Sequence, residues 1–102
     1  PCSMHTLAAV AAGLSDSLLT RAAHVHLKQR RALVLVPREM PLSLIDLENL
    51  TRVARAGAII APACPAFYLE PKSIDDIATF VASRVADCLG VNEEIEEYRS
   101  LE

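Results

Sequence analysis

The run LVLVPREMPLS, residues 33–43, limits the fold more than any other part of the chain. The uninterrupted apolar stretch Ala32–Val36 is typical of a strand buried on both faces of a parallel sheet. Two prolines then end the strand and enclose a charged pair, Arg38 and Glu39. The sequence therefore predicts a central strand whose carboxyl end carries an arginine and a glutamate in a restrained loop.

Helical and strand-like segments alternate along the chain. Apolar spacing and capping residues predict helices at residues 4–14, 18–28, 43–56 and 73–89, and a second short strand at 58–61. This order is typical of an α/β protein with a parallel, doubly wound sheet. Two buried strands cannot form a covered sheet alone, so we expect residues 1–90 to be the second half of a larger α/β domain. The remaining strands are expected upstream or on another chain.

Composition limits the classes of function. The chain has 102 residues, 52% of them apolar, which suits one small domain with a real core. Residues 91–102 carry five glutamates and one arginine, and we interpret them as an acidic solvated tail. The rest of the chain has little excess charge and few aromatic residues, so nucleic-acid binding is not favoured.

The cysteine pattern indicates a reducing compartment. Cys2, Cys64 and Cys88 form no CxxC motif and cannot all pair, so we expect reduced thiols in a cytoplasmic protein. No spacing of cysteine and histidine matches a zinc site, and no metal is predicted. The apolar runs are shorter than a membrane span.

Three proline-containing segments, PCSMHT, PREMP and PACPAFY, are predicted to reach the edge where the strands end. Ligands of open α/β sheets bind at this edge. Ser3, Met4 and Thr6 open a helix whose free N–H groups suit an anion or a flavin carbonyl, although ordinary capping by Ser3 also explains them. A structural ion pair is likewise an alternative explanation for the charged pair in PREMP.

Other candidate ligand groups are basic or aromatic. Arg21 and Lys28 are seven residues apart and would share a helical face over about 10 Å, as phosphate ligands or as solvated charges. Arg84 borders the apolar stripe of the last helix, where a surface role is the alternative. Tyr68 lies in a proline-rich loop and is expected either to pack in the core or to form a ligand wall.

Together these segments resemble the flavin prenyltransferases of the UbiX type, a family long described as aromatic-acid decarboxylases. The resemblance runs from PCSMHTLAAVAAG through LLTRAAHVHLKQRRALVLVPREMPLS and LENLTRVARAGAIIAPACPAFY to SIDDIATFVASRV. The motifs LVLVPRE and P-x-FY are its most specific parts. It corresponds to the C-terminal half of that family and implies a flavodoxin-like, three-layer fold with a parallel sheet.

The resemblance also implies an activity. The family transfers the dimethylallyl group of dimethylallyl phosphate to N5 and C6 of reduced FMN, without a metal. The prenylated FMN then serves a partner decarboxylase in ubiquinone-precursor or phenolic-acid metabolism. The family forms homo-oligomers, trimers or dodecamers, with active sites at subunit interfaces.

Residue roles follow from the same resemblance. The family residues that bind the prenyl phosphate fall on Arg21, Lys28, Arg38, Tyr68 and Arg84. Those that contact the flavin fall on Ser3, Met4 and Thr6, and the acid–base carboxylate falls on Glu39. Breaking a C–O bond to phosphate needs fixed positive charge, and ring closure at C6 needs a proton acceptor. The charged pair after the central strand could supply both.

Three departures from the family pattern fall on His24, Asp46 and Leu69–Glu70. The amino-terminal half of the family, which holds a phosphate loop for FMN, is expected on the natural chain or another chain, and without it we expect no activity. Two other functions stay open: a related flavin-dependent cysteine decarboxylase, and a non-catalytic FMN-binding or assembly subunit of a decarboxylase. The five phosphate-binding residues favour prenyl transfer over the cysteine decarboxylases, which do not need them.

Overall fold

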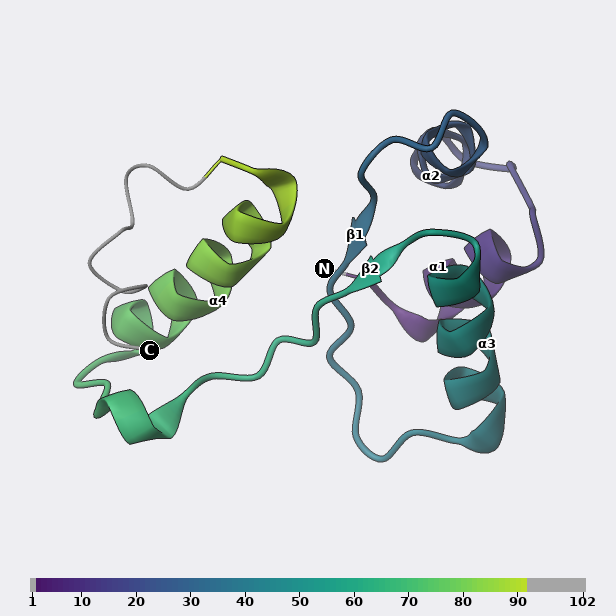
Figure 1. Ribbon diagram of the computed structural model, residues 1–102. Helices are drawn as coiled ribbons and strands as arrows, with labels where there is room; N and C mark the ends of the chain where they lie inside the picture. The colour runs from purple at the N-terminus through teal and green to yellow at the C-terminus, as the bar shows by residue number, and fades with distance from the viewer. Residues whose placement is uncertain (1, 92–102) are drawn as a thin grey trace. The chain divides into compact units, whose positions relative to one another are not determined.

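A computed structural model describes residues 2–91 (Figure 1). Its elements are α1 (Met4–Ala11), α2 (Leu18–Lys28), β1 (Val34–Leu35), α3 (Leu44–Arg55), β2 (Ile59–Ile60), the 3-10 helix η1 (Phe67–Leu69) and α4 (Ile74–Leu89). Contacts divide the described residues into two compact units, residues 2–62 and residues 63–91. The first unit holds both strands and three helices, as the predicted βα alternation requires.

The two strands pair in parallel. Val34 lies opposite Ile59 in the ladder, and the N–H of Ile59 donates to the carbonyl oxygen of Leu33 at 2.8 Å. The N–H of Ala61 donates to the carbonyl oxygen of Leu35 at 2.9 Å. Both predicted strands are therefore confirmed in place and direction, although their regular parts are shorter than the apolar runs.

The segment that leads into α1 pairs with the other edge of β1. The N–H of Cys2 donates to the carbonyl oxygen of Val36 at 2.9 Å, and Cys2 and Pro37 form a parallel bridge. Successive carbonyls of a strand point to opposite sides, so Leu35 faces β2 whereas Val36 faces Cys2. β1 thus lies between β2 and the Cys2 segment, and the carboxyl end of β1 is fixed beside the start of α1.

Serine side chains fix where the helices begin. Ser3, Ser17, Ser43 and Ser73 each accept a hydrogen bond from a backbone N–H in the first turn of the helix that follows. α1 ends at Ala11, three residues before the predicted end. Gly13 has a φ of 74°, a left-handed conformation that stops a helix.

α1 lies at the centre of the first unit and packs against both α2 and α3. Leu7 on α1 and Val53 on α3 are 0% and 1% exposed, and they anchor the apolar core. Around them the buried residues are Cys2, Val10, Ala11, Ala23, Leu35 and Ala58. This core fixes the position of α1, whose first turn lies beside the carboxyl end of β1.

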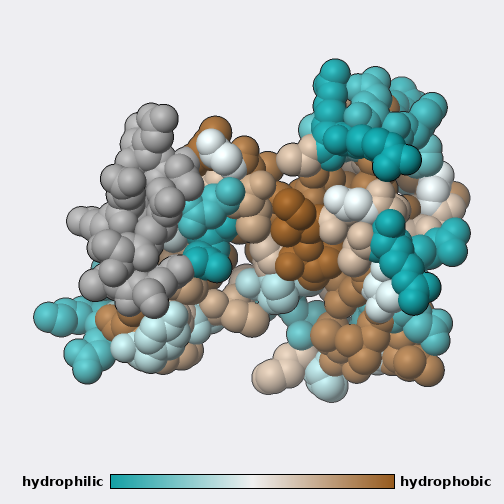
Figure 2. All heavy atoms as spheres, in the orientation of Figure 1, coloured by the Kyte–Doolittle hydropathy of each residue, from teal (hydrophilic) through white to brown (hydrophobic). Residues whose placement is uncertain are grey.

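The apolar face of α3 is only partly covered within the described residues. Val53 is buried and Leu50 packs against the core, but Leu44 and Leu47 are 69% and 47% exposed. Figure 2 shows apolar surface over the first turns of this helix. Within residues 2–91, the apolar face of α3 is therefore covered at Leu50 and Val53 but not over its first two turns.

The second unit contains η1 and α4. Ser73 caps α4, and Gly90 ends it with a φ of 77°, as the sequence predicts. The apolar stripe expected on α4 is half-buried at Ile77, Val81 and Val85. Apart from its first residue, the predicted acidic tail lies outside the described residues. No helix within residues 2–91 is long and apolar enough to cross a membrane.

Candidate functional site

The start of α1 is a set of backbone donors at the carboxyl edge of the sheet. The hydroxyl of Ser3 accepts from the N–H of Thr6 at 3.1 Å and donates to the Thr6 hydroxyl, also at 3.1 Å. Within residues 2–91, no acceptor is recorded for the N–H groups of Met4 and His5. Ser3 therefore caps the helix, and the first turn still has N–H groups that could bind a ligand.

The Met4 side chain has a different environment from its neighbours. It packs against the apolar core of the first unit, whereas Ser3 is exposed and Thr6 is half-buried. Thr6 also lines a groove of about 330 Å³ between α1, α2 and β1. Ser3 and Thr6 are thus the accessible side chains of this predicted flavin-contacting group.

Arg38 and Glu39 follow the buried Pro37, whose pairing with Cys2 fixes the loop. Both charged side chains are exposed. Within the described residues neither side chain makes a recorded hydrogen bond or ion pair, and no ion pair joins them. A structural ion pair therefore does not explain this motif, and both groups remain available to a ligand.

Arg21 and Lys28 lie on one uninterrupted helix, α2, so they share a face as predicted. Both are exposed. Lys28, in the last turn, lines a groove of about 530 Å³ with Arg52 and Arg55 from the end of α3. These two arginines were not selected from the sequence, although basic residues in the last turn of a helix are a recognisable pattern.

This groove lies at the opposite edge of the sheet from Arg38. α3 begins after the loop that leaves β1 and ends at Arg55, just before β2 begins. The ends of α2 and α3 are therefore beside the amino ends of the strands, whereas Arg38 follows the carboxyl end of β1. Within residues 2–62, the structure does not bring Lys28 and Arg38 together.

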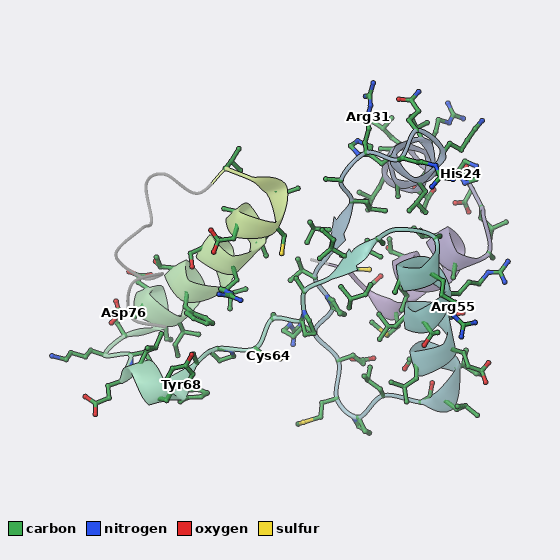
Figure 3. All side chains as sticks on the ribbon, in the orientation of Figure 1. His24, Arg31, Arg55, Cys64, Tyr68 and Asp76 are labelled. Atoms are coloured by element: carbon green, nitrogen blue, oxygen red, sulfur yellow. The ribbon has the colours of Figure 1, made fainter. Side chains whose placement is uncertain are left out.

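Tyr68 and Arg84 belong to the second unit. Tyr68 lies in η1 and is 72% exposed, so it is not a core residue among those described (Figure 3). Glu70, which follows closely, has a φ of 54°, a left-handed conformation that non-glycine residues rarely adopt. Arg84 lies on α4 with an exposed side chain.

The Cys2 side chain is buried at this edge of the sheet. Burial raises the pKa of the Cys2 thiol, which indicates a neutral, unreactive group beside the site.

His26 lines the same groove as Thr6, and its Nδ1 lies 3.0 Å from the carbonyl oxygen of Ala32. Within residues 2–91, no group of three or more histidine, cysteine or acidic side chains could hold a metal ion.

Comparison with known proteins identifies the family. A family model described as Flavoprotein matches residues 1–86, so the chain belongs to the Flavoprotein family. A flavin prenyltransferase UbiX from Thermoplasma acidophilum is 56% identical over 95 residues, 93% of this chain and 53% of the relative. The flavin prenyltransferase UbiX from Pseudomonas aeruginosa is 50% identical over 95 residues, 93% of this chain and 46% of the relative. The chain thus spans about half the length of the curated relatives it matches.

Two solved structures match the described fold. One is a UbiX protein, PadA1, in complex with FMN and dimethylallyl pyrophosphate. It is 50% identical with a TM-score of 0.88, covering 90% of this chain and 49% of that one. The other is a dodecameric, FMN-dependent UbiX-like decarboxylase from Escherichia coli O157:H7, 52% identical with a TM-score of 0.89, covering 93% and 51%. These matches confirm the resemblance and the flavodoxin-like α/β fold with a parallel sheet.

Proposed function

We propose that this chain forms part of a flavin prenyltransferase that joins a dimethylallyl group to reduced FMN. One observation carries the proposal. The pairing of Cys2 with Pro37 holds the helix start at Ser3 beside Arg38 and Glu39, whose side chains have no partner within residues 2–91. First-turn N–H groups, a guanidinium and a carboxylate thus lie at one edge of the sheet, which supports a site for a flavin ring and a phosphate there.

The start of α1 suits FMN. Its unpaired first-turn N–H groups would bind the carbonyl edge of the isoalloxazine ring, and the hydroxyls of Ser3 and Thr6 would add polar contacts, with Met4 beneath them in the core. Bound reduced FMN would supply the nucleophilic ring atoms. The protein would orient the ring and exclude water from it.

Arg38 and Glu39 would act on charge and on protons respectively. When the C–O bond of dimethylallyl phosphate breaks, negative charge grows on the departing phosphate, and the Arg38 guanidinium would stabilise it. Ring closure releases a proton at C6, and the Glu39 carboxylate would accept it. The buried Pro37, paired with Cys2, fixes the backbone from which both side chains extend.

The remaining phosphate ligands would be Arg21, Lys28, Tyr68 and Arg84. Lys28 and Arg38 are at opposite sheet edges in one copy, so both could bind one phosphate only if they came from different copies. This supports a homo-oligomer with sites between subunits, and the family resemblance supports three-fold symmetry in a trimer or dodecamer. The dodecameric relative supports the same assembly.

We further propose that the product, prenylated FMN, passes to a partner aromatic-acid decarboxylase in the cytoplasm. This follows from the family resemblance and from the lack of paired cysteines. The free thiols of Cys2, Cys64 and Cys88 suit a reducing compartment.

Mass spectrometry of the flavin tests the proposal. The full polypeptide that carries these residues is incubated without oxygen with reduced FMN and dimethylallyl phosphate. The mass of the released flavin is then measured. We expect a flavin heavier than FMN by one dimethylallyl group. Unchanged FMN, with release of carbon dioxide from a cysteine peptide, would instead establish a cysteine decarboxylase. Unchanged FMN with neither reaction would indicate a non-catalytic flavin-binding subunit.

A further inference from the structure

His24 lies between Arg21 and Lys28 on one face of α2. It follows Arg21 by three residues and precedes Lys28 by four, the spacings that bring side chains together on a helix surface. Because α2 is continuous over Leu18–Lys28, the three side chains form a row about 10 Å long.

The surroundings of His24 contain positive charge and no carboxylate. His24 is half-buried and lines the groove of about 530 Å³ together with Lys28, Arg52 and Arg55. None of the residues that line this groove is acidic. Figure 3 shows His24 and Arg55 on the two helices that border it.

Helix capping accounts for one of these basic groups and not for the others. The carboxyl end of a helix attracts cations, and the Nε of Arg52 donates to the carbonyl oxygen of Ala11, at the carboxyl end of α1, at 2.7 Å. No hydrogen bond or ion pair of the side chains of His24, Lys28 or Arg55 is recorded within residues 2–91. These three groups are therefore free to meet an anion that enters the groove.

We propose that His24 is a third phosphate-binding residue on α2, acting with Arg21 and Lys28 on the phosphate head of the prenyl donor. The proposal rests on the function proposed above and extends it. A neutral imidazole offers one N–H donor, and a protonated one offers two donors and a charge. His24 thus adds directional hydrogen bonding between two flexible cationic side chains.

Calorimetry tests this role in the full polypeptide loaded with oxidised FMN, with dimethylallyl phosphate as the titrant. We expect His24→Ala to weaken donor binding about ten- to a hundredfold, the effect of losing one hydrogen bond to a charged group. His24→Lys, which places an ammonium donor at the same position, should bind within about threefold of the parent protein. FMN affinity and melting temperature should stay unchanged in both variants.

His26→Ala is the matched control. It makes the same substitution on the same helix, but His26 is two residues away, faces the other groove and lies against Ala32. Donor affinity should not change in this variant. If His24→Ala binds the donor as tightly as the parent, or if His26→Ala weakens binding equally, the role of His24 is overturned while the proposed function stands. If the parent protein itself binds no dimethylallyl phosphate, the proposed function fails and the role of His24 fails with it.

Discussion

At the scale of residues, Arg38 and Glu39, the proposed catalytic pair, cost folding little. They follow directly on a buried strand, yet both remain exposed and unpartnered within residues 2–91, so neither charge loses its hydration when the chain folds. The sequence could predict both residues because a charged pair between prolines is a local pattern. Whether the two side chains pair with each other depends on rotamers, and the sequence left that question open.

Separate substitutions distinguish the two roles. In the full polypeptide, Arg38→Ala should weaken dimethylallyl phosphate binding and slow C–O cleavage, because it removes a fixed positive charge. Glu39→Gln keeps the shape of the side chain and should still bind FMN and the donor. Its turnover should fall roughly 10²–10⁴-fold, the usual contribution of general acid–base catalysis.

Melting temperature measured on the same preparations supplies the control for these variants. Glu39 makes no recorded contact within residues 2–91, so Glu39→Gln should melt as the parent does. Near-normal turnover in a destabilised Glu39→Gln protein would show that Glu39 is structural and not catalytic.

Cys2 should make stability depend on pH in the alkaline range. Burial raises the pKa of its thiol in the folded protein above the ordinary value of 9.0. Below that value both states hold the proton and the stabilisation is complete. As the pH rises above it, the unfolded thiol ionises first, so the free energy of unfolding decreases. Urea unfolding of the parent and of Cys2→Ala, measured from pH 8 to 10, should show a smaller decrease in the variant. Parallel curves would contradict this assignment.

At the scale of elements, local sequence signals predicted the type and position of the helices and strands better than their lengths. Serine caps and Gly57 located α3 and the start of β2, because capping depends on neighbouring residues. The regular part of β1 covers only Val34–Leu35 of the five apolar residues predicted as strand. Strand length depends on how many neighbours pair with it, and that information is not local.

The first turn of α3 offers a direct test of capping. The Ser43 hydroxyl accepts from the N–H of Asp46 at 3.0 Å, and the Asp46 carboxylate accepts from the N–H of Ser43 at 3.1 Å. Ser43→Ala should lower the free energy of unfolding by about 1 kcal/mol. Ser15→Ala, an exposed loop position with no recorded side-chain bond, is the control and should change it little. Equal unfolding midpoints for the two variants in urea would refute a stabilising role for this capping box.

At the scale of the molecule, the predicted site is not complete within one copy of the first unit. The sequence predicted that Lys28 and Arg38 both bind the prenyl phosphate, but the direction of α2 places Lys28 near the amino ends of the strands. The direction of a helix relative to the sheet follows from the topology of the fold. The residue pattern alone did not show at which edge of the sheet each end of α2 lies. The exposed Leu44 and Leu47 on α3 are consistent with a surface that another copy covers.

Subunit mixing can show whether Lys28 and Arg38 act in different copies. Lys28→Ala and Arg38→Ala should each be nearly inactive as pure oligomers. When the two variants are unfolded together at equal amounts and refolded, some sites receive an intact Lys28 from one subunit and an intact Arg38 from another. Random assembly would restore about a quarter of the parent activity if each site uses one residue from each of two copies.

Arg21→Ala mixed with Lys28→Ala is the matched control, because both residues belong to the same α2 helix. Every α2 in such a mixture carries one defect, so a site that uses both residues from one helix cannot be repaired. Light scattering on each mixture confirms that oligomers have reformed. Recovery in the first mixture and none in the second would establish sites shared between subunits. Equal absence of recovery in both, with oligomers intact, would mean that no site combines Lys28 of one copy with Arg38 of another, and the proposed phosphate site would lose one of these two residues.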